Sequence, residues 1–165
     1  MSEPAPPILI IGYGNPLRSD DGVGYYAACL LEASEWSGAA VAVVVCQQLT
    51  PELSSTLSEA GRVIFIDARA VHSASDVGRI FYEPVQPDPA ASPNLTHHVT
   101  PAALLTWTAL LYGGQPLGRC SQLGRQPSAM AWSYRRLCVP HYPVSWRQCR
   151  RQCRLLVPLH RYANL

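Results

Sequence analysis

Short runs of consecutive apolar residues alternate along the chain with segments in which apolar residues recur every three or four positions. The runs Ile8–Ile11, Ala40–Val45 and Val63–Ile66 are typical of strands buried on both faces of a parallel sheet. The segments Gly22–Trp36 and Thr50–Ala60 have helical spacing. The pattern predicts an α/β protein, a three-layer sandwich with a twisted, mostly parallel central sheet flanked by helices.

Two threonine–proline pairs predict helix starts, because threonine is a good N-cap and proline suits the first helical position. Thr50 would begin the helix that ends near Ala60, and Thr100 would begin another that ends at Gly113. Between them, Arg79–Tyr82 predicts a more exposed strand, and the proline-rich stretch 84–93 predicts a surface loop.

Three side chains capable of metal or acid–base chemistry fall near one edge of the predicted sheet. Asp21 follows the first strand, Asp67 ends the third, and His98 precedes the helix at Thr100. Loops at the carboxyl ends of parallel strands converge, and two carboxylates with an imidazole can share nickel, zinc or another first-row cation. Spacing alone leaves another interpretation open: Asp20 and Asp21 could complement a helix dipole, Asp67 could cap a turn, and His98 could lie on the surface.

The loop between the first strand and the first helix is rich in glycine but lacks the dinucleotide-binding pattern, since Leu17 stands where a third glycine is needed. Its residues Gly12-Tyr13-Gly14-Asn15, followed by Asp20-Asp21-Gly22, resemble the opening signature of the hydrogenase maturation endopeptidases. Segments 48–53, 65–68 and 96–101 resemble that family in order and spacing, so the resemblance covers roughly residues 8–114. Segment 48–53 is similar to the branch that serves bidirectional, NAD-linked hydrogenases.

The resemblance implies an endopeptidase that removes the C-terminal extension of the nickel-loaded large-subunit precursor of a nickel-iron hydrogenase. It implies catalytic and metal-contacting roles for Asp21, Asp67 and His98, with His97 as the alternative to His98. The nickel is carried by the precursor, and no nucleophilic serine or cysteine is needed. A metal can act as a Lewis acid or activate water, and an aspartate acting as general base stays an open alternative.

Charge divides the chain sharply. Residues 1–115 hold all 11 acidic residues and four arginines, a net charge of −7, whereas residues 116–165 hold nine arginines and no acid, a net charge of +9. Four of the six cysteines also lie in the second part. We therefore divide the chain into a maturation protease domain, 1–115, and an atypical Arg/Cys-rich tail, 116–165.

The tail lacks the strand, the Phe-x-x-Gly-x-x-Leu-Ser-Pro segment and the closing helix that the resemblance implies. Back-translated and read two bases later, from the third base of the Cys120 codon, it can yield that segment and then a stretch rich in alanine and valine. We interpret the tail as frameshifted between about Gln115 and Arg119, with the final strand and helix disrupted. Two other interpretations of the tail are disfavoured. One is a nucleic-acid or membrane arm. The other is a metal or disulfide site at Cys149 and Cys153, where no Cys-x-x-Cys pair supports zinc binding.

Other classes of function fit less well. The apolar run that starts at Ile8 stops at Gly12, and no basic segment precedes it, so we expect a cytoplasmic protein with neither a signal peptide nor a membrane partner, working as a monomer. A peptidyl-tRNA hydrolase also opens with Gly-x-Gly-Asn-Pro, but Asp20-Asp21 replaces its His-Asn pair, and the acidic body suits nucleic acid poorly. A non-catalytic chaperone that binds metalloprotein precursors is the third class.

Resequencing the gene tests the interpretation of the tail. We expect the DNA to place a one- or two-base change between the codons of about Gln115 and Arg119. Confirmation of the printed frame, together with a tail packed as an ordered strand and helix, would show that the frameshift interpretation is wrong.

Overall fold

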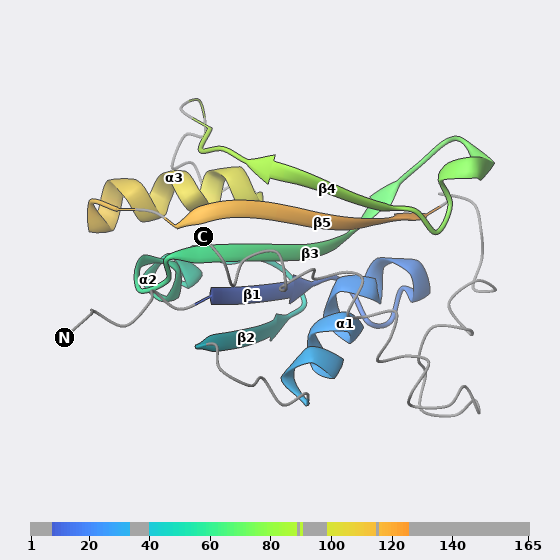
Figure 1. Ribbon diagram of the computed structural model, residues 1–165, viewed down its shortest axis with the longest axis horizontal. Coiled ribbons are helices and arrows are strands. Elements are labelled where there is room, and N and C mark those ends of the chain that lie inside the picture. The colour runs from blue at the N-terminus through green and yellow to red at the C-terminus, as the bar shows by residue number, and fades with distance from the viewer. Residues whose placement is uncertain (1–7, 34–39, 89, 91–98, 115, 126–165) are drawn as a thin grey trace.

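The computed structural model contains one sheet, built from five strands in the order β2-β1-β3-β5-β4 (Figure 1). Four strands are parallel, and β4 runs antiparallel to β5 at one edge. The strands are β1 (Ile8–Tyr13), β2 (Val41–Cys46), β3 (Arg62–Ala70), β4 (Ile80–Val85) and β5 (Leu117–Arg125). The structure describes residues 8–33, 40–88, 90, 99–114 and 116–125.

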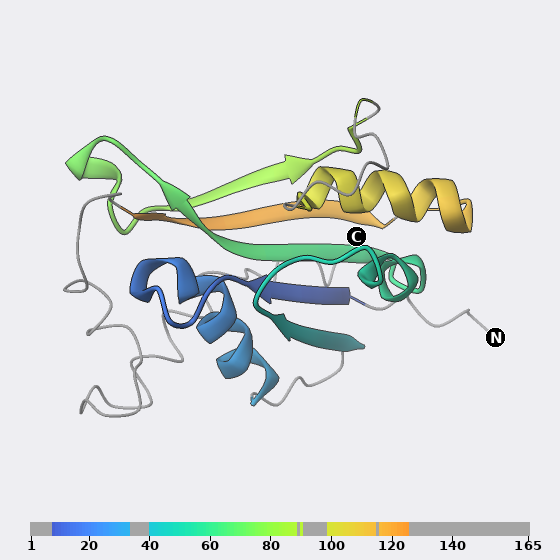
Figure 2. The ribbon, with the colours of Figure 1, turned by 180° about the vertical axis from the view of Figure 1, so that it is seen from behind.

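Helices cover both faces of the sheet, which gives the predicted three layers. Side chains that alternate along β1 separate two apolar clusters: Leu9 and Ile11 pack on the side of α2 and α3, and Ile10 packs on the side of α1. Figure 2 shows the arrangement from behind. The helices are α1 (Val23–Glu32), α2 (Leu53–Ser58) and α3 (Pro101–Tyr112), and the 3-10 turns are η1 (Ser19–Gly22) and η2 (Ala74–Asp76). In the part of the chain that the structure describes, no helix is long and apolar enough to cross a membrane.

Helix α3 begins and ends as predicted. The Thr100 hydroxyl accepts a hydrogen bond from the Ala103 N–H at 3.1 Å, and Pro101 occupies the first turn. Gly113, at φ 73°, takes the left-handed conformation that closes a helix, and its N–H bonds to the Ala109 carbonyl. Leu104 and Leu105, one turn inside, are buried in the core.

Several details differ from the prediction. Strand β3, predicted to end at Asp67, continues to Ala70, and β4 continues to Val85, into the stretch predicted as a loop. Helix α2 begins at Leu53 rather than after Thr50, since residues 51 and 52 form a turn and no side chain caps the helix. A hydrogen bond from the Thr50 side chain lowers the pKa of Glu52. Strand β2, predicted to be buried, is half-buried. Its place at the edge of the sheet explains this, since it pairs with β1 on one side only.

The final strand forms, which corrects the expectation that it is disrupted. Strand β5 pairs with β3 along its full length, from Arg62↔Leu117 to Ala70↔Arg125, and with β4 on its other edge. The closing helix, and the rest of the tail from residue 126, lie outside the described residues. The division of the chain at residue 115 and the frameshift both stay predictions.

Replacing Thr100 by alanine removes the side-chain cap of α3. We expect the free energy of unfolding to fall by about 1 kcal/mol, the usual effect of losing a threonine cap. Chemical denaturation measures it, and Thr100→Ser, which keeps the hydroxyl, is the control. Equal stability of the alanine and serine variants would contradict the assignment of this cap.

Candidate active site at the carboxyl end of the sheet

Two glycines let the first loop and helix approach the strand ends at backbone distance. Gly24, in the first turn of α1, lies directly against the carbonyl oxygens of Ile66 and Tyr13, and any Cβ there would collide with both. Gly14, at φ +141°, lies against the backbone of Asp21 in the same way. Because only glycine fits at such contacts, η1 is held against the carboxyl end of β1 and against β3 at Ile66, where its pairing with β1 ends.

This packing brings Asp21 and Asp67 together. Asp21 lies in η1 and Asp67 in β3, directly after Ile66, the last β3 residue that pairs with β1. Both are half-buried. The negative charge of Asp21 contributes to raising the pKa of Asp67, so the two carboxylates share one electrostatic environment.

Each oxygen of the Asp67 carboxylate accepts a hydrogen bond. The Tyr13 hydroxyl donates to Oδ2 at 2.9 Å, and the N–H of Ala68 donates to Oδ1 at 2.7 Å. The side chain of Gln122, its partner in register on β5, also bonds to it. Burial is the largest influence on this carboxyl and raises its pKa, while the three hydrogen bonds act in the opposite direction.

The tyrosine beside Asp67 stays in its neutral form. Burial, reinforced by the charge of Asp67, raises the pKa of Tyr13 far above its usual range. Its hydroxyl is therefore a permanent hydrogen-bond donor to the carboxylate at ordinary pH.

Two thiols lie nearby, and neither has the properties of a nucleophile. Burial, together with the charges of Asp67 and Glu83, raises the pKa of Cys120 to about 12, and burial also raises the pKa of Cys46. The reactive form of cysteine is the thiolate. Both side chains pack in the apolar cluster on the α2 and α3 side.

The predicted histidine cannot be compared with this geometry, since His98 and its alternative His97 lie outside the described residues. The next residue, Val99, packs against the same apolar cluster as Tyr13. Within the described part of the chain, no three His, Cys, Asp or Glu side chains form a group able to hold a metal ion. Asp21 and Asp67 are thus brought together, and the third member stays a prediction.

Tyr13 and Gln122 are the partners of Asp67 that sequence reasoning missed. Tyr13 occupies the variable position between two glycines, and alternation along the first strand could have placed its ring beside the third strand's end. Gln122 lies in the segment interpreted as an atypical tail, so no signal pointed to it.

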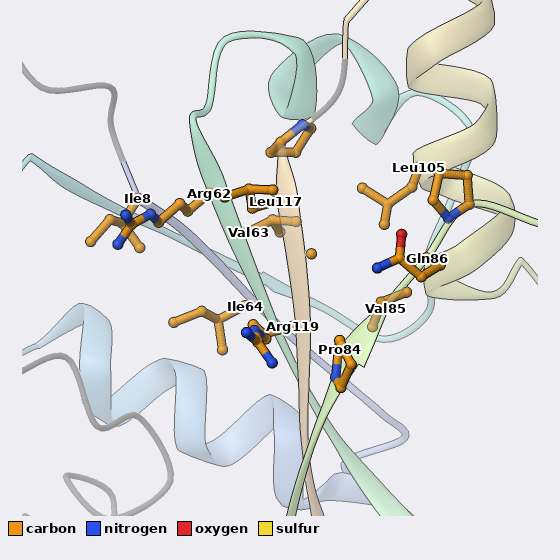
Figure 3. Close-up of a pocket in the computed structure, with 13 residues that line it drawn as sticks. Ile8, Arg62, Val63, Ile64, Pro84, Val85, Gln86, Leu105, Leu117 and Arg119 are labelled. Atoms are coloured by element: carbon orange, nitrogen blue, oxygen red, sulfur yellow. The ribbon is translucent and has the colours of Figure 1, made fainter. Parts of the chain in front are cut away.

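A cavity of about 270 Å³ lies at the opposite end of the strands. Figure 3 shows Ile8 and Arg62 at the start of β1 and β3, Leu117 and Arg119 in β5, and Val85 at the end of β4 around it. Parallel sheets carry their reactive groups at the carboxyl ends of strands. This cavity is therefore distinct from the Asp21–Asp67 site.

Comparison with solved structures supports the fold. The chain superposes on the [NiFe] hydrogenase maturation protease HycI from Thermococcus kodakarensis KOD1 with a TM-score of 0.55 and 20% identity, over 94% of this chain and 90% of that one. For the hydrogenase maturating endopeptidase HybD from E. coli the TM-score is 0.57 and the identity 19%, over 96% and 94%. For the solution structure of an endopeptidase from Escherichia coli the values are 0.58 and 18%, over 96% and 94%.

No protein-family model and no curated protein sequence matches the chain. At this level of identity the solved structures establish the fold, a five-stranded, mostly parallel sheet with helices on both faces.

Replacing Asp67 by asparagine tests its environment. The folded state raises the pKa of this carboxyl, so the stability associated with its protonated form is complete below about pH 3.9, its ordinary value, and is lost as pH rises through the folded pKa. Asparagine keeps the shape, removes the buried charge and can still accept from Ala68. We expect Asp67→Asn to melt at a higher temperature than the parent at pH 7, with the difference closing near pH 4.

Asp88→Asn, on the exposed surface, is the matched control, and no comparable gain at pH 7 is expected for it. A destabilised Asp67→Asn protein at pH 7 would show that the hydrogen bonds outweigh the burial of the charge.

Proposed function

We propose that this chain is an endopeptidase that removes the C-terminal extension of the nickel-loaded large-subunit precursor of a nickel-iron hydrogenase. The likeness of fold to two hydrogenase maturation proteases, over nine-tenths or more of each chain, supports this proposal. The loop from Gly12 to Gly24, with its Gly-x-Gly-Asn and Asp-Asp-Gly elements, supports it independently.

The proximity of Asp21 to Asp67 is the observation that carries the proposal. The two residues come from different motifs, one after the first strand and one in the third, and the contacts at Gly14 and Gly24 place η1 beside Ile66, the residue before Asp67. Two like charges beside each other raise each other's energy unless a cation or proton is shared between them. A cation delivered by the substrate would relieve that repulsion.

In this proposal the nickel is part of the substrate and is held by the precursor itself. Asp21, Asp67 and His98 contact it and so position the neighbouring peptide bond. A carboxylate oxygen has two lone pairs, so the bonds from Tyr13 and Ala68 leave acceptor capacity on both oxygens of Asp67. Oxygen and imidazole nitrogen ligands suit a divalent first-row cation.

Hydrolysis adds the oxygen of water to the scissile carbonyl carbon, breaks the C–N bond and leaves one proton on the departing amine. The nickel carried by the substrate could activate that water, or one of the two aspartates could accept its proton. No acyl intermediate on a cysteine is required, which agrees with the raised pKa of Cys46 and Cys120. We further propose a cytoplasmic monomer, with a precursor of the bidirectional, NAD-linked type as its substrate.

Processing of a purified nickel-loaded precursor tests the function, with the shortened large subunit measured by mass spectrometry. We expect cleavage by the parent chain from a sequence-verified gene, and none of a nickel-free precursor. Asp21→Asn, Asp67→Asn and His98→Ala should each reduce the rate by about 100-fold or more, as for loss of a positioned acid–base group.

Asp88→Asn and His72→Ala are the matched controls, since both residues are exposed, and they should process normally. Normal processing by His98→Ala, together with loss of processing by His97→Ala, would assign the nickel-contacting role to His97. Stable binding of the precursor without cleavage would identify a chaperone instead. The absence of both binding and cleavage would refute the proposal.

A further inference from the structure

The hydroxyl of Tyr13 contacts Asp67 from β1. It donates to Oδ2 at 2.9 Å across a sequence separation of 54 residues. We infer that Tyr13 is a positioning residue that fixes the orientation of the Asp67 carboxylate toward the substrate. This inference rests on the proposed function.

Without Tyr13, the carboxylate would be oriented less firmly. The N–H of Ala68 belongs to the adjacent residue and holds only Oδ1. The torsion that turns a carboxylate about its Cβ–Cγ bond is broad and roughly two-fold, so a bond to one oxygen does not define the plane of the group. Tyr13 supplies the donor at Oδ2 from one neighbouring strand, and Gln122 adds a bond from the other strand, so donors on both sides define the plane.

The donors flank Asp67 from both neighbouring strands. Tyr13 comes from β1 on one side, and Gln122 comes from β5 on the other, where it pairs with Asp67 in register. Both are carried by strands inside the sheet, and rigid elements hold functional groups more accurately than loops do. The carboxylate is therefore held between two strands, with acceptor capacity left on it for a further partner.

The ring of Tyr13 gives the hydroxyl its fixed place. It packs against the apolar cluster that includes Leu9, Phe65 and Leu104, with Cys46 as its register partner on β2. Phenylalanine would fill the same space and keep those contacts. Packing therefore does not require the hydroxyl, and its described role is the hydrogen bond to the Asp67 carboxylate.

Steady-state processing by Tyr13→Phe tests this role. We expect kcat to fall by about 10- to 100-fold, the usual effect of losing a partner that orients a metal-contacting group. KM should change by less than about two-fold, because precursor contacts outside the site are untouched. Tyr82→Phe is the control: it removes a buried hydroxyl that has no hydrogen-bond partner in the described part of the chain, and it should process at the parent rate.

Two further measurements separate positioning from folding. In the Asp67→Asn background, Tyr13→Phe should leave the residual rate unchanged, since Tyr13 acts through Asp67. Incorporating 4-aminophenylalanine at position 13, which restores an N–H donor on a ring of the same shape, should recover much of the lost kcat. This variant also decides the matter if Tyr13→Phe folds poorly.

A parent chain that processes the precursor, with Tyr13→Phe matching its kcat, would overturn the inference and leave the proposed function standing. An equal loss through Tyr13→Phe in the presence and in the absence of the Asp67 carboxylate would also overturn it. A parent chain that fails to process any nickel-loaded precursor would refute the proposed function itself.

Discussion

The direct contact between the backbone of Gly24 and the carbonyl oxygens of Ile66 and Tyr13 determines the geometry of everything at this end of the molecule. A side chain at position 24 would push α1 and the preceding turn away from the strand ends. Asp21 would move with that turn, since its backbone lies against Gly14. The glycines are therefore needed less for loop flexibility than for the close backbone packing of η1 and α1 on β1 and β3.

This packing is maintained although the charge of Asp21 disfavours ionisation of Asp67. Asp67 is half-buried, and its ionised form is destabilised by desolvation and by Asp21, with only partial relief from three hydrogen bonds. A group whose environment opposes its charged state is characteristic of sites that act on a charged ligand. The apolar packing of β1 and β3 offsets this unfavourable electrostatic free energy, since Ile10, Ile11, Phe65 and Ile66 are all buried.

The apolar runs predicted β1 and β3 well, because such runs bury on both faces wherever they lie inside a sheet. They could not reveal that β2 is an edge strand, since strand order is absent from a local pattern. The meeting of Asp21 and Asp67 followed from the rule for strand ends, whereas the bond from Tyr13 depends on register. Strand β5 was missed because Gly118, Ser121 and Gly124 are poor strand formers, and pairing on both edges overrides that preference.

The interior position of β5 has a consequence for how the sheet assembles. Strand β4 precedes it in the chain but pairs with it alone among the described strands, so β4 has no template until residues 117–125 are available. Pairing of β3 with β5 spans the intervening β4 and α3, a long loop to close, and such contacts form late in folding. During synthesis the chain would thus hold β2, β1 and β3 as a half-sheet, and both remaining strands would join it only after residues 117–125 have emerged.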